Sequence, residues 1–451
     1  MSINPIDSEV WGAWFGTDQL RELFSDRAQI ELMLEVEAAL ARAQSKLGLV
    51  PPEIAETISA AAKAANLDMG SIAESTRRVG YPVVALVREL GQVCGADAAR
   101  YVHLGATTQD ILDTALVLQL RAAVGLIRRD LVELARALAR RAKQYRDTPM
   151  AARTHLQHAV PTTFGLKCAQ WAAPLKAHVE RLDHATRRVM VVQFGGAAGT
   201  LAVLGEHGPA VAEQLAKELE LGAPAAPWHT QRDGLAEVAG VMALICGSLA
   251  KFAGDIALLM QSEVGEVAEP HQEGRGGSST MPQKRNPIAS EYILAAVRAV
   301  HALVPIMFGA MAADHERATG PWQAEALALP QIIVLTGGAL AHSRSIADGM
   351  TVDTQRMRRN LELTGGLIMA EAIATALTPR LGRTEAEAAV QRACNRALAE
   401  RRALAEILRS DPQLVPQFAD SELRRILEPA SYLGAAGALV DRVAAMIEQL
   451  T

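Results

Sequence analysis

The feature that most constrains the fold is a long stretch with helical periodicity and no proline. Across residues 113–145 the apolar side chains recur at steps of three and four: Leu116, Leu120, Val124, Ile127, Leu131, Leu134 and Leu138. This spacing lines one face of a single helix roughly 45–50 Å long. Helices of this length are typical of bundles, and they often present apolar faces to other chains.

Four further stretches have the same character: residues 161–192, 234–260, 287–312 and 323–348. Half of the residues are hydrophobic but only 4% are aromatic, which favours close-packed helices over a sandwich or barrel. We therefore predict an all-α fold in three parts. These are an N-terminal helical domain (1–106), a central long-helix bundle (107–350) and a C-terminal helical domain (351–451).

The bulk properties exclude several classes of protein. A net charge of -5 with no basic tail argues against nucleic-acid binding. The four cysteines lie far apart without a CxxC pair, so we expect reduced thiols, no zinc site and a cytoplasmic protein. The first residues do not have the pattern of a signal peptide. The most membrane-like window, 326–343, contains Pro330 and is better explained as a buried helix, so no membrane partner is expected. A mean hydropathy of +0.10 predicts an oligomer.

The segment most informative about function is 274–287, Gly-Arg-Gly-Gly-Ser-Ser-Thr-Met-Pro-Gln-Lys-Arg-Asn-Pro, called the signature segment below. It joins glycines to two serines and a threonine, and then to Lys284 and Asn286, which lie between two prolines. A Gly/Ser linker before a helix capped by Asn286 would explain much of this composition. The fixed order of residues, however, resembles the GSSxMPxKxNP loop of the fumarase/aspartase superfamily.

That resemblance implies a homotetramer of bundled helices with shared active sites and a small polycarboxylate substrate. A proton is removed next to a carboxylate, a doubly charged aci-carboxylate forms, and a group leaves from the neighbouring carbon. It implies Ser278 as the base, with Lys284 and Asn286 stabilising the charge. No metal and no cofactor are expected.

A second motif, Tyr-Val-His-Leu-Gly-Ala-Thr-Thr-Gln-Asp at 101–110, precedes the first long helix. Thr107 and Asp110 have the spacing of a capping box, and a helix N-terminus rich in hydroxyls also suits a carboxylate. The string resembles the first shared region of the superfamily. This implies substrate contacts from Thr107 and Thr108, with His103 close by.

A third motif is Arg-Thr-His-Leu-Gln-His-Ala-Val-Pro at 153–161. A histidine can deliver a proton to a leaving group near neutral pH, although a single histidine before a helix is more often a surface residue. The string resembles the Thr-His-x-Gln motif of the superfamily. It implies His155 as the general acid, with Thr154 and Gln157 contacting substrate.

Two further segments bear on the substrate. Gln231 lies in a Gln-Arg-Asp string shared with adenylosuccinate lyases and lactonizing enzymes, which implies a ligand contact. Arg317 belongs to a His-Glu-Arg string that is followed here by Trp322-Gln323-Ala324-Glu325, without the hydroxyls that bind a nucleotide phosphate. This run resembles the bacterial 3-carboxy-cis,cis-muconate lactonizing enzymes. His155 keeps an alternative open, a C–N lyase that releases fumarate from an N-substituted aspartate. An inactive helical scaffold is disfavoured because the polar site residues are all present.

Overall fold

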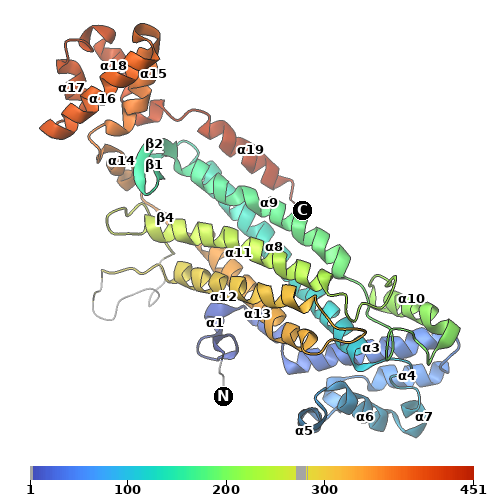
Figure 1. Ribbon diagram of the computed structural model, residues 1–451. Helices are drawn as coiled ribbons and strands as arrows, with labels where there is room; N and C mark the ends of the chain where they lie inside the picture. The colour runs from blue at the N-terminus through green and yellow to red at the C-terminus, as the bar shows by residue number, and fades with distance from the viewer. Residues whose placement is uncertain (1–3, 271–280, 282, 451) are drawn as a thin grey trace. The chain divides into compact units, whose positions relative to one another are not determined.

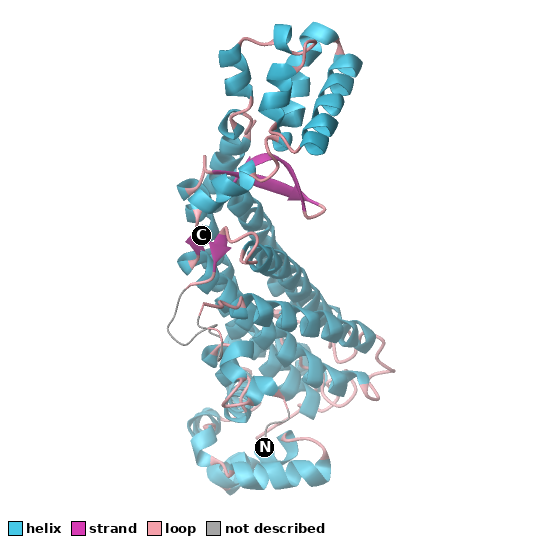
Figure 2. Ribbon diagram, turned by 90° about the vertical axis from the view of Figure 1, so that its left-hand side faces the viewer, coloured by secondary structure: helices cyan, strands magenta, loops and turns pink. Residues whose placement is uncertain are grey.

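The computed structural model describes residues 4–270, 281 and 283–450, and helices dominate it (Figures 1 and 2). Each stretch predicted to be a long helix contains one: α8 (Thr108–Gln144), α9 (Phe164–Val189), α11 (Asp233–Leu259), α12 (Ile288–Ala310) and α13 (Pro321–Gly349). The first of them has 37 residues, which corresponds to about 55 Å. The all-α prediction is confirmed.

Shorter elements complete the chain. Before α8 lie α1 (Gly12–Phe15), α2 (Asp18–Leu23), α3 (Asp26–Lys46), α4 (Pro52–Ala61), α5 (Met69–Val79), α6 (Val83–Cys94) and α7 (Ala96–Ala99), and α10 (Gly208–Leu219) precedes α11. After α13 come α14 (Thr354–Glu362), α15 (Ala370–Leu381), α16 (Arg383–Glu400), α17 (Leu404–Ser410), α18 (Asp420–Ile426) and α19 (Ala436–Glu448). Single 3-10 turns are η1 (Pro5–Asp7), η2 (Ala64–Asn66), η3 (Gly205–His207), η4 (Leu367–Met369), η5 (Val415–Gln417) and η6 (Pro429–Ser431). The strands are β1 (Pro149–Thr154), β2 (Gln157–Thr163), β3 (Val267–Ala268) and β4 (Thr351–Val352).

The chain divides into two compact units. Unit 1 comprises Met1–Asp130, His178–Leu249 and Tyr292–Ala341, and unit 2 comprises Leu131–Ala177, Ala250–Glu291 and His342–Thr451. The boundaries between the units fall inside the five long helices. Both units are therefore assembled from segments far apart in the sequence.

The core of unit 1 forms around α3, which lies beside α4 and α10 (Figure 1). Ser25 begins α3 by accepting a hydrogen bond from the N–H of Ala28 at 3.2 Å. Leucine, isoleucine and alanine side chains from α3, α4, α6 and α10 then form one continuous apolar cluster. The Gln44 amide on α3 donates to the carbonyl of Leu104 at 2.7 Å. This bond ties the segment before α8 to the core.

Unit 2 contains a β-hairpin that the sequence analysis did not anticipate. β1 and β2 pair antiparallel, and Thr154 lies opposite Gln157, which leaves His155 and Leu156 as a two-residue turn (Figure 2). Ala151 on the hairpin is buried in a small apolar cluster with Leu361 of α14. The helical stretch expected from residue 161 begins instead at Phe164. Residues 157–163 pair with the preceding strand, so tertiary pairing has overridden the weak local pattern.

The helices α11, α12 and α13 are long and apolar enough, by length and composition alone, to cross a membrane. A fourth candidate arises only if α14 and the following η4–α15 segment, bent by 82°, are counted together. Several large apolar side chains on the three long helices are exposed, including Leu244, Phe308 and Leu327.

Candidate functional site

The start of α8 is organised by one buried carboxylate, Asp110. Five donors converge on its two oxygens: the backbone N–H groups of Thr107 (3.0 Å), Gly195 (2.9 Å) and Gly196 (2.9 Å), the Gln193 amide (3.1 Å) and His229 Nε2 (2.8 Å). The bond to Thr107 is one half of the capping box predicted from the sequence. Because a carboxylate takes these bonds, the chain segments at residues 107, 195 and 229 are fixed to one another.

This arrangement leaves the side chains of the first turn available. Among the described residues, none forms a hydrogen bond with the hydroxyl of Thr107 or Thr108, and both residues are half-exposed or less. A helix N-terminus attracts anions through its free N–H groups and dipole. The turn therefore has the composition and the polarity of a carboxylate-binding site.

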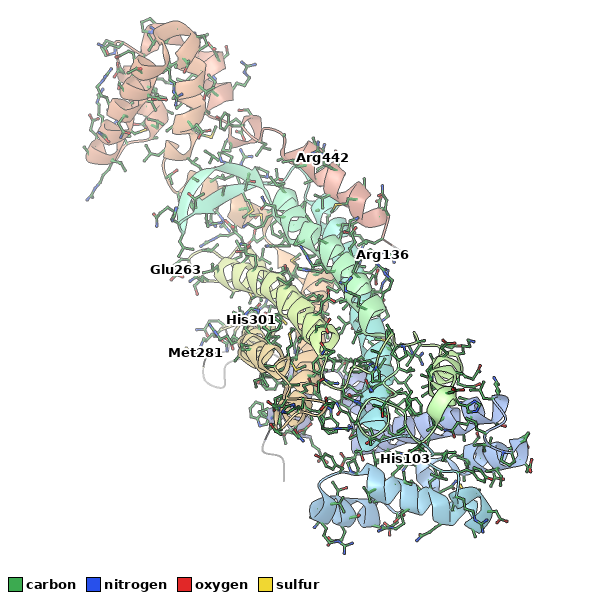
Figure 3. All side chains as sticks on the ribbon, turned by 45° about the vertical axis from the view of Figure 1, so that its right-hand side comes forward. His103, Arg136, Glu263, Met281, His301 and Arg442 are labelled. Carbon is green, nitrogen blue, oxygen red and sulfur yellow. The ribbon has the colours of Figure 1, made fainter. Side chains whose placement is uncertain are left out.

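His103 lies just before this turn, amid the side chains of the N-terminal helices (Figure 3). Its backbone is in the left-handed region, with φ of 62°. Its Nδ1 lies 2.6 Å from Oε1 of Glu37, a fully buried side chain on α3. Burial alone would lower the pKa of His103, but the charges of Glu37 and Asp110 outweigh it and the pKa is raised. The structure thus favours a positively charged ring at this position.

A second buried network begins one turn further along α8. Arg232 donates to both oxygens of Asp113, at 2.6 and 3.0 Å, and to both oxygens of Glu325 on α13, at 2.9 and 2.5 Å. Burial opposes the charge on Arg232, yet the two carboxylates raise the pKa of the guanidinium. Burial raises the pKa of Glu325, although Arg232 opposes this shift. The network fixes α13 against α8 within unit 1.

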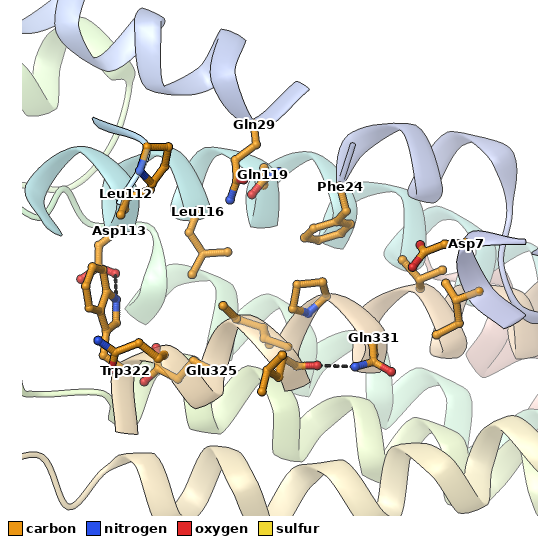
Figure 4. Close-up of a pocket in the computed structure, with 18 of the residues that line it drawn as sticks. Asp7, Phe24, Gln29, Leu112, Asp113, Leu116, Gln119, Trp322, Glu325 and Gln331 are labelled. Atoms are coloured by element: carbon orange, nitrogen blue, oxygen red, sulfur yellow. Dashed lines mark hydrogen bonds between the residues drawn. The ribbon is translucent and has the colours of Figure 1, made fainter. Parts of the chain in front are cut away.

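A cavity of about 550 Å³ in unit 1 adjoins this network (Figure 4). At one end Trp322 donates to Asp113 at 3.1 Å and stacks on Tyr81 with ring centroids 5.8 Å apart. Phe24 lines the other part of the cavity together with amide side chains such as Gln331. The wall is thus mixed, with charged, amide and apolar side chains along it, as in many small-molecule pockets.

Two further predicted residues lie in unit 1. Gln231 is exposed and lies between His229, which contacts Asp110, and Arg232. Arg317 donates to the carbonyl of Ala197 at 2.8 Å, one residue after the Gly195-Gly196 pair that Asp110 holds. The segments carrying His103, Thr107, Thr108, Gln231 and Arg317 are therefore linked around Asp110.

The other predicted residues belong to unit 2. His155 and Leu156 have φ values of 51° and 63°, and both are exposed at the tip of the hairpin. A two-residue turn with two positive φ values is usually Asn-Gly, so a His-Leu pair in this turn is strained. Thr154 and Gln157 pair directly below the tip and are also exposed. Strain of this kind at an exposed histidine is a common mark of a functional position.

A buried ion pair supports this hairpin. Arg153 donates to both oxygens of Glu266, at 2.9 and 2.7 Å, and Asn360 donates to the same carboxylate at 2.7 Å. Glu266 immediately precedes β3. Burial and the charge of Arg153 lower the pKa of His158, so this second histidine of the motif is neutral at physiological pH.

The signature segment is described only in part, and Ser278 lies outside the described residues. Lys284 is exposed, and its N–H closes a turn onto the Met281 carbonyl at 3.0 Å, while Asn286 is half-buried. The helix after it begins at Ile288, two residues beyond Asn286.

The cap of α12 comes from Glu269 rather than from Asn286. The buried Glu269 carboxylate accepts the N–H groups of Ala289 (3.0 Å) and Ser290 (2.8 Å) and the Ser290 hydroxyl (2.7 Å). A carboxylate at this position satisfies free N–H groups and complements the helix dipole. Glu269, which precedes the signature segment in the chain, thus binds Ala289 and Ser290, which follow it.

Sequence reasoning missed the supporting carboxylates, above all Glu37, Glu266 and Glu269. Each is a charged residue in a buried, mostly apolar stretch, and that was the available signal. Their partners lie 66, 113 and 20 or 21 residues away in the chain, so pattern alone could not identify them. Among the described residues, no group of three or more His, Cys, Asp or Glu side chains could hold a metal ion.

Comparison with known proteins gives a consistent result. Residues 15–301 match a family model described as Lyase, and residues 366–443 match one described as Adenylosuccinate lyase C-terminus. The 3-carboxy-cis,cis-muconate cycloisomerase of Pseudomonas aeruginosa is 47% identical over 97% of this chain and 96% of its own length. A nitrosuccinate lyase of Streptomyces davaonensis is 44% identical over 93% of this chain and 90% of its own. The crystal structure of 3-carboxy-cis,cis-muconate lactonizing enzyme from Pseudomonas putida superimposes with a TM-score of 0.94 at 46% identity, covering 98% of this chain and all of that one.

Proposed function

The chain belongs to this lyase family of the fumarase/aspartase superfamily, and from that premise we propose that it is a 3-carboxy-cis,cis-muconate cycloisomerase. Such an enzyme interconverts an unsaturated tricarboxylate and its lactone. Several cycloisomerases between 42% and 47% identical support this substrate, each matched over nearly the whole chain.

The observation that carries the proposal is the turn at Thr107 and Thr108. Two hydroxyls at a helix N-terminus, with His103 beside them and its pKa raised by Glu37 and Asp110, suit a substrate with several carboxylates. Further along unit 1, Trp322 donates a hydrogen bond to Asp113, and Glu325 accepts one from Arg232. This run lacks the hydroxyls that a nucleotide phosphate needs, which disfavours adenylosuccinate as the substrate.

The proposed reaction steps follow from the negative charge that builds up on a substrate carboxylate. In the lactonizing direction a substrate carboxylate oxygen bonds to the β-carbon of a double bond, and the electron pair moves into the neighbouring carboxylate as an aci-carboxylate. The α-carbon then takes a proton from the Ser278 hydroxyl. In reverse, ionised Ser278 removes that proton and the C–O bond breaks. Lys284 and Asn286 stabilise the doubly charged intermediate, and Gln231, Arg317, Thr154 and Gln157 position the substrate.

His155 supports a second candidate from the same reaction class, elimination of an amine-like group from a substituted succinate. A leaving carboxylate needs no proton, whereas a leaving amine does. The exposed, strained position of His155 suits a proton donor. The nitrosuccinate lyase among the relatives shows that a chain this similar is named for a different leaving group.

We also infer that the active form is a homotetramer with shared active sites. The exposed apolar side chains on α11, α12 and α13 would be buried between subunits. We likewise propose that the chain has three domains, with boundaries after residues 106 and 350.

The test of function is the ultraviolet spectrum of the purified protein mixed with 3-carboxy-cis,cis-muconate. We expect rapid loss of the diene absorbance, and Ser278→Ala should abolish this loss while oligomeric state and melting temperature stay unchanged. If the absorbance persists with a folded oligomer, the cycloisomerase proposal is wrong. Fumarate release from N-substituted aspartates is then the assay.

A matched variant separates the two candidate reactions. His155→Trp removes the proton donor and keeps a large side chain at the turn. A cycloisomerase should keep a kcat within about tenfold of the parent, because its leaving group is a carboxylate. An amine-releasing lyase should lose about 100-fold or more.

A further inference from the structure

We propose that Glu37 is a positioning residue that holds His103 as an imidazolium, so that the ring nitrogen Nε2 donates a hydrogen bond to a substrate carboxylate. The proposal deepens the proposed function, because it names the group that recognises one carboxylate of a polycarboxylate substrate. It concerns residues of unit 1 alone, all of them described.

The contact with Glu37 occupies the Nδ1 edge of the His103 ring. Nδ1 lies 2.6 Å from Glu37 Oε1, so Nδ1–H donates to this carboxylate. In a neutral ring with its proton on Nδ1, the other nitrogen is an acceptor and repels a carboxylate. Nε2 becomes a donor only when the ring is charged. The contact with Glu37 therefore links anion binding at His103 to protonation of the ring.

The opposite edge of the ring is available. The His103 side chain keeps 21% of its surface exposed, and none of the described residues forms a hydrogen bond with Nε2. His103 follows α7 and precedes the Thr107–Thr108 turn by only four residues. Asp110 in the first turn of α8 also acts electrostatically on the ring, so a charge bound at that turn should act on it too.

The charges around the ring favour the cationic state. Glu37 from α3 and Asp110 from the first turn of α8 both act on it. On α7 and the residue after it, Asp97 and Arg100 lie 3.9 Å apart and are exposed, so their charges offset each other at the surface. Arg42 and Lys46, further along α3, both bond to Glu218 of α10. The neighbouring cations thus have carboxylate partners of their own.

Glu37 is also an unusual residue for a purely structural contact. Its Oε2 is buried and has no hydrogen-bond partner among the described residues. Leaving a buried carboxylate oxygen unpaired is unfavourable, and a glutamine amide would accept the same bond from Nδ1–H without a charge. The negative charge itself is therefore the property that the site uses.

The test compares Glu37→Gln with the parent enzyme at two pH values. Glutamine keeps an acceptor for Nδ1–H but removes the charge, so the ring should be neutral at pH 7.5 and charged again near pH 6. We expect KM for 3-carboxy-cis,cis-muconate to rise about tenfold at pH 7.5 and to return to within about threefold near pH 6, with kcat changed less than about threefold. Glu37→Asp should restore part of the affinity at pH 7.5. An equal rise in KM at both pH values would overturn the proposal.

A readout without turnover keeps the proposal testable if the substrate assignment fails. With ¹³C-labelled histidine in the intact enzyme, the His103 resonance, assigned by its loss in His103→Gln, should titrate at lower pH in Glu37→Gln than in the parent. Identical titration would refute the proposal whatever the enzyme acts on. Calorimetric binding of tricarballylate, a saturated tricarboxylate, replaces KM in that case.

Two further variants serve as controls. Glu35→Gln removes a charge from an exposed position of the same helix, where Glu35 pairs with Arg42. It should change neither KM nor the His103 titration. In the His103→Gln background, adding Glu37→Gln should produce no further rise in KM, because the two residues act through one another. An additional rise would contradict the proposal.

Discussion

The start of α8 in unit 1 and the tip of the β1–β2 hairpin in unit 2 carry predicted site residues in opposite surroundings. At α8, Asp110 is buried and accepts five hydrogen bonds, so its neighbours are fixed before any ligand binds. At the hairpin, His155 is exposed and its backbone is strained. The region at α8 is thus organised by contacts within its own unit, whereas the hairpin tip has no such network around His155 among the described residues.

The contrast fits the role proposed for each region. A carboxylate is recognised best by donors that are already oriented, since no binding energy is then spent on ordering them. A proton donor must instead reach a leaving group and exchange with solvent between turnovers. Rigidity suits the first task and an accessible turn suits the second.

The largest effect should come from Asp110→Ala. Removing this carboxylate leaves buried N–H donors unpaired, which should lower the free energy of unfolding by about 3–5 kcal/mol. We expect kcat/KM to fall by about 100-fold or more, because the Thr107–Thr108 turn loses its support. Urea unfolding at fixed protein concentration and steady-state kinetics measure both effects.

The matched control for Asp110→Ala is Asp97→Ala, an exposed acidic residue close by in the chain. It should change stability by less than about 0.5 kcal/mol. If Asp110→Ala is equally mild, the start of α8 is not organised by this carboxylate and the contrast between the two regions fails.

The next largest effect should come from Glu266→Ala below the hairpin. It leaves Arg153 without its carboxylate partner, which should destabilise the protein by about 3 kcal/mol. The turn bearing His155 loses its anchor, so kcat should drop about tenfold with a smaller change in KM. Removal of the exposed side chain in Glu263→Ala should do neither. Unchanged kcat in Glu266→Ala would show that the hairpin does not depend on this ion pair.

The smallest effect should come from Leu156→Gly at the tip. Glycine tolerates a positive φ, so the variant should gain up to about 1 kcal/mol of stability despite its greater entropy when unfolded. Leu398→Gly, an equally exposed leucine in α16, should lose about 0.5–1 kcal/mol because glycine is unfavourable in a helix. Thermal unfolding of the two variants distinguishes them by the sign of the change. A loss at both positions would mean that the turn is not strained.

The sequence allowed the fold class and the family to be predicted, and both are confirmed. Long amphipathic helices can be recognised from the local sequence alone, because a repeat of apolar residues at steps of three and four does not depend on distant partners. The capping contact between Thr107 and Asp110 was predictable for the same reason, being only three residues apart. The roles assigned to Ser278, His155 and the substrate-binding residues, and the three-part division of the chain, stay predictions.

The remainder could not be predicted because it depends on pairing across the chain. The hairpin is a local exception: residues 149–154 pair with residues 157–163 across a two-residue turn, but the apolar pattern there gave no alternation strong enough to show it. The four other donors to Asp110 lie 83 to 119 residues away. A buried carboxylate indicates that partners exist, but only the fold identifies them.

The Glu269 cap has a consequence for the covalent chain. Glu269 stands before the signature segment and binds the backbone at Ala289 and Ser290 after it, so the two ends of the segment are fastened to each other by hydrogen bonds. A single peptide-bond cut between them would therefore not release either end. Insertions or deletions between these points would change the length of a closed loop without shifting the start of α12, and the entropy of loop closure grows only slowly with length. The start of α12 is thus held by a residue that lies before the segment.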